Sequence, residues 1–336
     1  MPVTIRDVAK QAGVGIATVS RVLNGSPSVS EETREKVLAA IEDLNFTPNP
    51  IARRLSTGRT QTIGVIVPYF TLPDFVKRLQ GVQQALIESE YDLVLFNVET
   101  PSQRDKYFDD LNRHMRVDGL LIISLGVTDW HLEQFRKAET PVVLIDSFHP
   151  NAHRVIVDHI AGGRMATSHL IELGHEKIAF VSDSLENPFH FAATIERYTG
   201  YRHALEDAGI GPKPEYHQHG EHGREVARQL GENLLKLADP PTAVFAATDT
   251  QAIGVLDAAR RNGVKVPESF SIIGYNDIRD AEYLNLTTIR QPLYESGMRG
   301  VELLLELMET PIEEPQEIML DLELVIRETT SKNHPE

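Results

Sequence analysis

The feature that most constrains the fold is a repeated alternation of short apolar runs with amphipathic segments from residue 61 onward. Apolar runs bounded by turn residues are typical of strands buried on both faces, and apolar residues spaced three or four apart are typical of helices. Alternating strands and helices predict a parallel sheet with helices on both faces. Two such series follow one another, so the sequence predicts an α/β body of two doubly wound lobes.

The ends of the apolar runs set the boundaries of these elements. The expected strands are residues 62–67, 92–98, 118–124 and 141–146 in the first series, and 177–183, 242–248 and 270–276 in the second. The expected helices are residues 74–89, 102–116, 160–174, 192–209, 222–238 and 249–262. In a body of this kind a ligand is expected in the crevice outside the carboxyl ends of the strands.

Residues 1–48 predict a different, all-α unit. Thr4 and the acid three residues later have the spacing of a helix N-cap, and apolar residues then recur at helical spacing as far as Gly13. A second helix begins at Ile16, and Ser30 caps a third over residues 31–44. Two short helices joined by a glycine-containing turn form a helix-turn-helix. A three-helix bundle that binds no DNA is the alternative.

The second helix favours DNA binding over that alternative. Thr18, Ser20 and Arg21 are polar at positions where a recognition helix meets phosphates and base edges. The guanidinium of Arg21 can donate two hydrogen bonds to O6 and N7 of a guanine. Ile16 and Ala17 open the helix and can contact a thymine methyl group. We therefore expect this helix to read DNA sequence in the major groove.

The charge distribution is consistent with a DNA-facing N-terminus. The whole chain carries a net charge of −16, which by itself disfavours binding to nucleic acid. Residues 1–60, however, contain eight Lys and Arg against six Asp and Glu, a balance of +2 that leaves −18 for the rest. A basic end on an acidic body is typical of a protein that presents that end to nucleic acid.

Composition excludes several classes of protein. The chain has no cysteine, which rules out a disulfide framework, a Cys-ligated zinc site and a thiol nucleophile. Its first residues lack the apolar run of a signal peptide, and no apolar run approaches the roughly 18 residues of a membrane span. We therefore expect a cytoplasmic protein with no membrane partner.

Residues 46–59 predict a short helix that cannot be stable alone. Asn49 can cap it and is followed by a proline suited to the first turn, so residues 51–56 would form fewer than two turns. Such a helix needs a second copy of itself or DNA as a partner. Arg53 before Leu55 suits a phosphate clamp beside an apolar minor-groove wedge. A flexible linker is the alternative.

Polar residues follow several of the expected strands. Any one of them could simply cap the next helix, and for Asp249 that alternative is equally good. Because five such positions occur in two lobes whose strand ends face one crevice, we expect a ligand site there. The expected residues are Ser124, Asp146, Asp158, Asp249 and Asp277, with Arg197 and Gln291 completing the set.

Several motifs resemble the lactose-repressor (LacI/GalR) family of bacterial transcriptional regulators. The resemblance continues to about residue 328 and so covers nearly the whole chain. The motifs that carry it are Val-Thr-Ile-Arg-Asp-Val-Ala (3–9), Ala-Gly-Val (12–14), Thr-Val-Ser-Arg-Val-Leu-Asn (18–24), Thr-Arg-Glu-Lys-Val (33–37) and Ile-Ala-Arg-Arg-Leu (51–55). At Gly15 the chain departs from the family, which usually has Ser or another capping residue there, so we assign Gly15 no DNA contact.

The resemblance implies a repressor that reads a pseudo-palindromic operator as a homodimer, one headpiece (residues 1–48) per half-site. Residues 49–60 would be the hinge helix and linker, with Leu55 as the minor-groove wedge, and Ile16, Ala17 and Arg21 would be the main base readers. The full set of expected DNA contacts is Thr4, Ile16, Ala17, Thr18, Ser20, Arg21, Asn24, Asn49, Ala52, Arg53 and Leu55.

For residues 61–330 the resemblance implies a periplasmic-binding-protein-like effector-binding and dimerisation domain. Lobe 1 would comprise about 61–160 and 292–321, and lobe 2 about 161–291 and 322–330. The implied effector contacts are Asp146, Arg197, Asp277 and Gln291, with Phe75 as a stacking face; Tyr69, Phe148, Phe189 and Phe191 are further wall candidates. Carboxylates and amides suit vicinal hydroxyls, so the expected effector is a sugar or a sugar derivative such as a sugar phosphate, with purines and nucleosides as the alternatives. Its binding would change the angle between the lobes and so control the hinge helices.

Other functions remain as alternatives. Some relatives respond to a phosphorylated carrier protein instead of a small molecule. A solute-binding protein would share the body but would need a signal peptide. The chain has no phosphate-binding loop, nucleophile elbow or His-Glu-x-x-His motif, so we do not expect an enzyme.

Two smaller expectations concern metal and oligomeric state. His217, His219 and His222 could ligate a metal, but an exposed strand end running into a helix is the favoured interpretation, and we expect no metal or cofactor. Residues 328–336 are too short and polar for a heptad-repeat helix, so we expect a dimer and not a tetramer.

Overall fold

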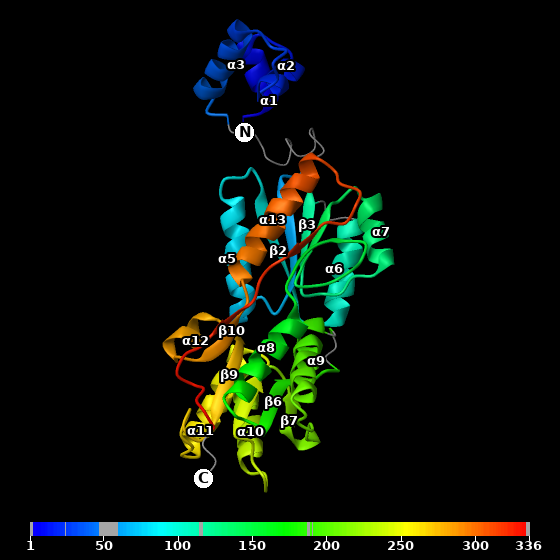
Figure 1. The fold of residues 1–336 in the computed structure, drawn as a ribbon. Coiled ribbons are helices and arrows are strands. Elements are labelled where there is room, and N and C mark those ends of the chain that lie inside the picture. Colours follow the sequence, from blue (N-terminus) through cyan, green and yellow to red (C-terminus); the bar gives the residue numbers. More distant parts are fainter. Residues whose placement is uncertain are drawn as a thin grey trace. The chain divides into compact units, whose positions relative to one another are not determined.

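The computed structural model describes residues 3–23, 25–46, 60–113, 117–186, 189 and 191–333. The chain divides into two units, Met1–Thr60 and Gln61–Glu336 (Figure 1). None of the helices in these described ranges combines the length and the apolar character that a membrane-spanning helix needs.

The N-terminal unit is a bundle of three helices, as the sequence predicts. They are α1 (Ile5–Ala12), α2 (Ile16–Leu23) and α3 (Glu31–Asp43). Asp7 accepts hydrogen bonds from the backbone nitrogen and the hydroxyl of Thr4, at 2.9 and 2.7 Å, which satisfies the start of α1. Gly13 ends α1 with a φ of +67°, a conformation that glycine adopts at little cost. Small and β-branched side chains from all three helices form the core: Val8, Ala9, Val19, Val22, Val37 and Ala40.

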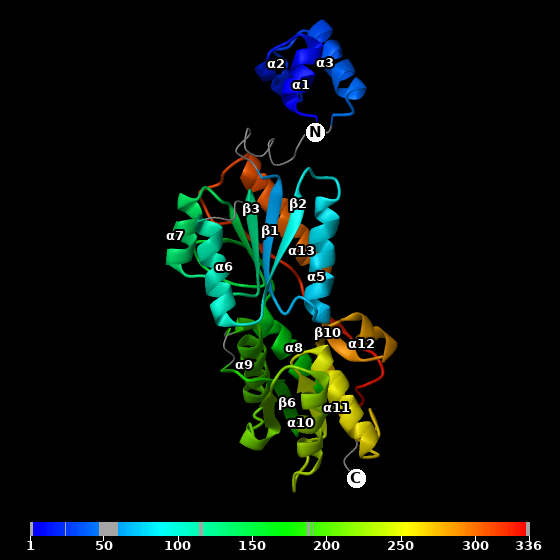
Figure 2. The same ribbon diagram turned by 180° about the vertical axis from the view of Figure 1, so that it is seen from behind.

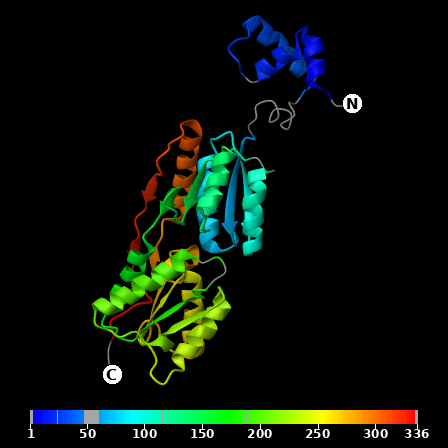
Figure 3. The ribbon, with the colours of Figure 1, turned by 90° about the vertical axis from the view of Figure 1, so that its right-hand side faces the viewer.

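The first lobe of the body is a six-stranded sheet in the order β11-β5-β4-β3-β1-β2, and its neighbouring strands pair in parallel. Its strands are β1 (Thr62–Pro68), β2 (Asp92–Val98), β3 (Gly119–Ile123), β4 (Val142–Ile145), β5 (His153–Ile156) and β11 (Glu317–Met319). Its helices are α5 (Pro73–Leu86), α6 (Pro101–Arg113), α7 (Asp129–Lys137) and α13 (Leu293–Glu309). In the side view of Figure 3, α13 and α6 lie on opposite sides of the sheet.

The second lobe is also a six-stranded sheet, in the order β12-β10-β9-β8-β6-β7, in which β12 alone runs antiparallel to its neighbour. Its strands are β6 (Ile178–Asp183), β7 (His217–Gly220), β8 (Ala243–Ala246), β9 (Ser271–Asn276), β10 (Thr287–Arg290) and β12 (Glu323–Val325). Its helices are α8 (His159–Glu172), α9 (Ala192–Asp207), α10 (Arg224–Leu235), α11 (Asp249–Arg261) and α12 (Arg279–Tyr283), with a 3₁₀ turn at Pro214–Tyr216.

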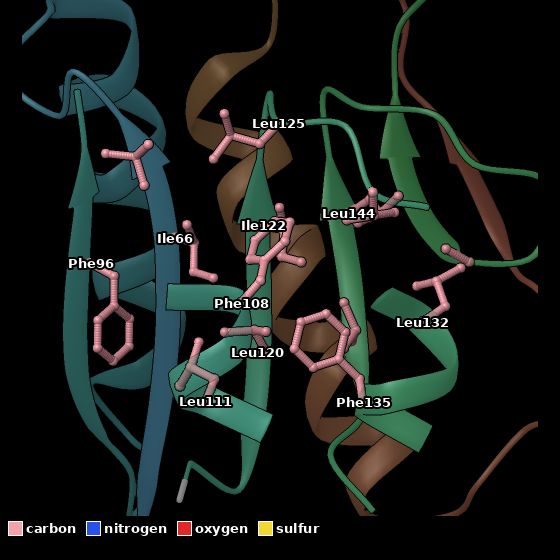
Figure 4. Close-up of a cluster of buried hydrophobic side chains, with 14 of the residues drawn as sticks. Ile66, Phe96, Phe108, Leu111, Leu120, Ile122, Leu125, Leu132, Phe135 and Leu144 are labelled. Atoms are coloured by element: carbon pink, nitrogen blue, oxygen red, sulfur yellow. The ribbon is translucent and has the colours of Figure 1, made fainter. Parts of the chain in front are cut away.

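Each sheet therefore has an apolar core on both faces, which is why its strands are continuous apolar runs. In the first lobe, one core lies under α6 and α7 and includes Phe108 and Phe135 (Figure 4). The other lies under α5 and α13. In the second lobe the two cores lie under α10 and α11 and under α8 and α9. The two doubly wound lobes expected from the sequence are thus confirmed.

Three connections join the lobes. The chain passes from β5 to α8, returns from β10 to α13, and passes again from β11 to β12. Figures 1 and 2 show these segments between the two sheets from opposite sides. The sequence patterns did not predict α7, α12, α13, β10, β11 or β12. The strands among them are short, and β11 and β12 are edge strands with partly exposed side chains, so they lack a long apolar run.

Helices α8 and α9 touch through their backbones. A Cβ atom added at Gly163 would lie 2.2 Å from the carbonyl oxygen of Arg197, and one added at Gly200 would lie 2.1 Å from that of Ile160. No larger residue fits there without moving the helices apart. This contact matters for the ligand site because α9 carries Arg197 and α8 begins at His159.

We expect Gly200→Ala to destabilise the body by about 1–3 kcal/mol, because the added methyl group forces α8 and α9 apart. The measurement is urea-induced unfolding followed by circular dichroism. Gly211→Ala is the matched control, since a Cβ at Gly211 meets no atom within 4 Å. Equal stability of the two variants would contradict the tight helix contact.

Asp249 lies inside the second lobe and not at its surface. Its Oδ2 accepts a hydrogen bond from the backbone nitrogen of Ile278 at 2.8 Å, and its Oδ1 accepts one from the hydroxyl of Thr288 at 2.6 Å. The helix cap of α11 is Thr248, whose hydroxyl accepts from the nitrogen of Gln251. Burial raises the pKa of Asp249 to about 7, because water no longer stabilises the carboxylate.

This shift predicts a pH-dependent stability. The folded state binds the proton of Asp249 more tightly than the unfolded state does, so this residue's contribution is full below pH 4 and is lost as the pH rises toward and through 7. Asp249→Asn removes the titration. We expect the free energy of unfolding of the variant, relative to that of the natural protein, to rise from pH 5 to pH 8 by about 1.4 kcal/mol for each pH unit between 5 and 7, as measured by urea-induced unfolding at both pH values. A relative stability that is the same at both pH values would show that Asp249 keeps an ordinary pKa.

Candidate functional site

Helix α2 presents the exposed face of the headpiece that the sequence assigns to DNA. Its buried side is made of Val19 and Val22, which pack on the other two helices. On the opposite side Ile16, Ala17 and Arg21 are exposed, while Thr18 and Ser20 are half-buried. Thr4 is exposed at the start of α1.

The exposed side of α2 carries side chains that can contact DNA. Ile16, the first residue of α2, is 46% exposed and so is accessible to a base edge. Among the described residues, Arg21 has no ion-pair partner, so its guanidinium is free to donate to a ligand. Asn24, Asn49, Ala52, Arg53 and Leu55, and with them the expected hinge helix, lie outside the described residues.

The body contains a cavity of about 770 Å³ between the two lobes. It lies at the carboxyl ends of strands from both sheets, where doubly wound folds bind ligands. The first lobe contributes Tyr69, Leu72, Asp74, Phe75, Ser124 and Asp146. The second contributes Asp183, Ser184, Glu186, Phe191, Ala192, Ala193, Thr194, Arg197, Gly220, Glu221, His222 and Thr248.

Asp146 is the centre of a buried polar network at one end of this cavity. Its Oδ2 accepts a hydrogen bond from Ser124 at 2.7 Å and from Arg78 at 3.3 Å, both in the first lobe. Its Oδ1 lies 2.8 Å from Nε2 of His159 and accepts from Gln291 at 3.0 Å, on the second-lobe side of the connections. The carboxylate therefore bridges the lobes.

The network keeps Asp146 ionised. Burial alone would raise its pKa, but the positive charge of Arg78 and the hydrogen bond from His159 hold the pKa well below its ordinary range. Burial and the nearby charge of Arg197 lower the pKa of His159, so its ring is neutral at pH 7. A neutral ring that donates from Nε2 to Asp146 must accept at Nδ1. Nδ1 lies 3.1 Å from the hydroxyl of Tyr275 and 3.3 Å from Nε of Arg197, and both can donate.

Arg197 lines the cavity but is only 5% exposed. Besides His159, it donates to the carbonyl oxygen of Ala247 at 2.8 Å and to the side chain of Gln291 at 3.4 Å. Its guanidinium also stacks on the ring of Tyr275, 3.8 Å from the centroid. Three of its five N–H donors are thus used within the protein.

A second polar pair, buried Asp183 and half-buried His222, also lines the cavity. Asp183 ends β6 and accepts hydrogen bonds from His222 at 3.0 Å and from Gln251 at 2.8 Å. Burial opposes the charged form of His222, but the hydrogen bond and charge of Asp183, together with the charge of Asp74, outweigh it and raise the pKa of His222. This pair ties the ends of β6 and β7 to helix α11.

Aromatic side chains form one wall of the cavity. Tyr69 of the first lobe packs edge-on against Phe189 and Phe191, with ring centroids 5.7 and 6.5 Å apart. Phe189 is buried in the core of the first lobe although it precedes α9 of the second. Phe75 is buried at the start of α5 and also faces the cavity. Phe148, by contrast, is 59% exposed and stacks with Arg154 outside the cavity lining.

The structure brings together four of the expected effector residues on the cavity surface: Phe75, Ser124, Asp146 and Arg197. Gln291 is 4% exposed and lies behind that surface, hydrogen-bonded to two of them. Among the described residues that line the cavity, Asp158, Asp249 and Asp277 do not occur.

These three aspartates have structural partners instead. Asp158 is exposed and caps α8 by accepting from the nitrogen of Ala161 at 2.8 Å. Asp277 forms ion pairs with Arg290 and Arg327, each at 2.7 Å. With Asp249 inside the second lobe, the expectation that all the polar strand ends face one ligand needs correction, because helix caps and internal ion pairs produce the same sequence signal.

Sequence reasoning missed several residues of the site. Arg78 and His159 are 1% and 5% exposed, and each holds Asp146. Asp74 and Asp183 line the cavity. Asp183 could have been found, since it is the last residue of an expected strand. Arg78 was recognisable as a charged residue on the apolar side of its helix.

The three-histidine motif is divided among different roles. His217 stacks on Tyr198 with centroids 4.5 Å apart, and burial lowers its pKa to about 4. Its Nε2 lies 3.1 Å from the hydroxyl of Ser182, whereas His222 forms a hydrogen bond with Asp183. Within the described ranges, no group of three His, Cys, Asp or Glu side chains is placed to hold a metal ion. The motif begins in a strand, β7, and ends at His222, in the loop that leads into helix α10.

Comparison with known proteins adds independent information. Residues 4–49 match the model of "Bacterial regulatory proteins, lacI family", and residues 167–330 match that of a "Periplasmic binding protein-like domain". The chain is 34% identical to catabolite control protein A of Priestia megaterium, over 98% of this chain and 100% of that protein. It is also 34% identical to the HTH-type transcriptional repressor PurR of Vibrio campbellii, over 98% and 99%.

Solved structures agree with these matches over the full length. The transcriptional regulator CelR in complex with cellobiose is 32% identical, with a TM-score of 0.71 over 97% of this chain and 99% of that one. The lac repressor dimer bound to operator and the anti-inducer ONPF is 29% identical, with a TM-score of 0.84 over 98% and 100%. Because whole-length relatives exceed 30% identity and the headpiece matches the family model, the chain belongs to the lacI family of bacterial regulatory proteins.

Proposed function

We propose that this protein is a transcriptional repressor that binds a pseudo-palindromic operator as a homodimer and changes its operator affinity when a hydroxyl-rich small molecule binds between the lobes. The observation that carries the proposal is the cavity whose two sides are joined by the Asp146 network. A ligand there touches both lobes and can favour one arrangement of them over another.

DNA recognition is assigned to α2. Arg21 would donate to a guanine edge, and Ile16 and Ala17 would contact bases near the start of the helix, where a helix-turn-helix reads the major groove. Thr4, Thr18 and Ser20, with Asn24, would bind phosphates. Residues 49–56 would pair with a second copy on operator DNA, where Leu55 would enter the minor groove with Asn49, Ala52 and Arg53 beside it.

Ligand recognition is assigned to the cavity surface. Phe75 supplies an apolar face for a sugar ring, and Ser124, Asp146 and Arg197 supply hydrogen bonds to hydroxyls. Because both oxygens of Asp146 already accept hydrogen bonds, a ligand hydroxyl that reaches it competes with Ser124, Arg78, His159 or Gln291. A ligand can shift the lobes only to the extent that it binds one arrangement better, and competition at a bridging residue provides such a difference.

The lac repressor dimer with operator and the CelR complex with cellobiose support the two halves of this proposal. A carrier protein as the regulating partner is less well supported, because the cavity between the lobes offers a small molecule contacts with both lobes that a protein surface could not reach.

We expect Arg21→Ala to weaken operator binding by about 1–3 kcal/mol and to relax the preference for one base pair in each half-site. Operator selection followed by fluorescence anisotropy measures both effects. Arg136→Ala is the matched control, since Arg136 is an exposed arginine of α7 paired only with Glu133 among the described residues. An equal loss on every DNA sequence would show that Arg21 contacts phosphate only.

A second test compares two hydrogen bonds to Asp146. Gln291→Ala removes a bond between the lobes, at 3.0 Å, whereas Ser124→Ala removes one within the first lobe, at 2.7 Å. We expect the factor by which a saturating sugar changes operator affinity to fall about tenfold in Gln291→Ala, equal to about 1.4 kcal/mol of coupling. The Ser124→Ala variant should bind the sugar more weakly but keep that factor at saturation, because Ser124 and Asp146 belong to the same lobe.

The sugar for this test comes from a thermal-shift screen that includes cellobiose and ribose. It is one that raises the melting temperature of the natural protein. Equal coupling in the two variants would contradict the bridging role of Gln291. If sugars, nucleosides and purines all leave operator affinity unchanged, the proposal of small-molecule control fails.

A further inference from the structure

The cavity surface carries more negative charge than its cations balance. Asp74 lies in the first turn of α5, Glu186 follows β6 and Glu221 follows β7, so the three carboxylates reach the cavity from both lobes. Asp74 is half-buried, and the other two are exposed at the rim. Among the described residues, these three side chains have no hydrogen-bond or ion-pair partner. Their oxygen atoms are therefore free to accept hydrogen bonds from a ligand.

The cations at the cavity are already engaged. Arg197 uses three N–H donors and one face of its guanidinium inside the protein. His222 is paired with Asp183, so this pair is close to neutral whenever the histidine is protonated. Arg78 and Arg197 together exceed the charge of Asp146 by one. Three free carboxylates outweigh that single excess positive charge, which leaves the cavity net negative.

The N-terminus of α9 favours an anion and so opposes the excess negative charge of the cavity. The first residues of α9, Ala192, Ala193 and Thr194, line the cavity, and that helix has no side-chain cap and no acid in its first turn. A helix N-terminus offers free N–H donors and the equivalent of about half a positive charge. Half a charge does not offset an excess of about two negative charges, but the same N–H groups suit the oxygen atoms of neutral hydroxyls.

We propose that the cavity selects an uncharged, hydroxyl-rich ligand and rejects ligands that carry a phosphate or a carboxylate. This inference rests on the proposed function, which assigns the effector to this cavity. Ligand hydroxyls donate to Asp74, Glu186 and Glu221, and ligand oxygens accept from the start of α9. A phosphate group at either place would face uncompensated carboxylates across a partly enclosed space, where charge repulsion is weakly screened.

The test uses a triple variant of the full chain, D74N/E186Q/E221Q, which keeps the size of each side chain and removes its charge. Thermal shift is measured with ribose and ribose 5-phosphate, with glucose and glucose 6-phosphate, and with inorganic phosphate against chloride at equal ionic strength. The natural protein should gain no more stability from phosphate or from either sugar phosphate than from chloride. The triple variant should bind inorganic phosphate at least tenfold more tightly than the natural protein does.

The matched control is E88Q/E139Q/E268Q, which removes the same charge from exposed carboxylates outside the cavity lining. It should behave like the natural protein toward phosphate. Equal phosphate binding by the triple variant and this control overturns the inference, because the cavity carboxylates would then not be the cause of rejection. Stabilisation of the natural protein by a sugar phosphate more than by its parent sugar also overturns it.

These outcomes separate the inference from the proposed function. A sugar phosphate that binds the natural protein and changes its operator affinity would end the charge-selection inference and leave small-molecule control intact. A neutral sugar that stabilises the protein without changing operator affinity would end the proposal of small-molecule control and leave the charge-selection inference intact.

Discussion

The body of this protein depends on a single ionised carboxylate inside a low-dielectric junction. Asp146 stays charged because Arg78 lies behind it and because Ser124, His159 and Gln291 donate to its two oxygens. A buried ion is tolerated only when it is paired and hydrogen-bonded in this way. Since its partners come from both lobes, the electrostatic requirement of one residue also fixes how the lobes meet.

Close helix packing makes this network possible. Glycines let α8 lie against α9 and α5 lie against α13 backbone to backbone, since a Cβ at Gly81 or Gly297 would overlap the facing carbonyl oxygen. The first contact brings Arg197 beside His159, and the second brings Arg78 within 2.9 Å of the hydroxyl of Ser296. The charged groups of the junction are therefore positioned by packing of small residues, and a ligand that moves them must also move helices.

The predictable part of the structure is local. The three headpiece helices and most central strands follow from apolar periodicity and from capping residues such as Thr4, because those signals act within a few residues. The candidate site was predicted only in part. Asp158, Asp249 and Asp277 follow strands just as Asp146 does, yet one caps a helix, one is enclosed in a lobe and one forms ion pairs. A polar residue at a strand end does not reveal which of these partners it has.

The sequence by itself determined the two series of strands and helices, the helix-turn-helix and the charge contrast between the first sixty residues and the rest. The tertiary structure decided which polar side chains share a cavity and which form hydrogen bonds or ion pairs within the fold. Gln291 and Asp146 are 145 residues apart in the chain and 3.0 Å apart in the structure. Burial, pairing and pKa depend on such distant neighbours, and no local pattern encodes them.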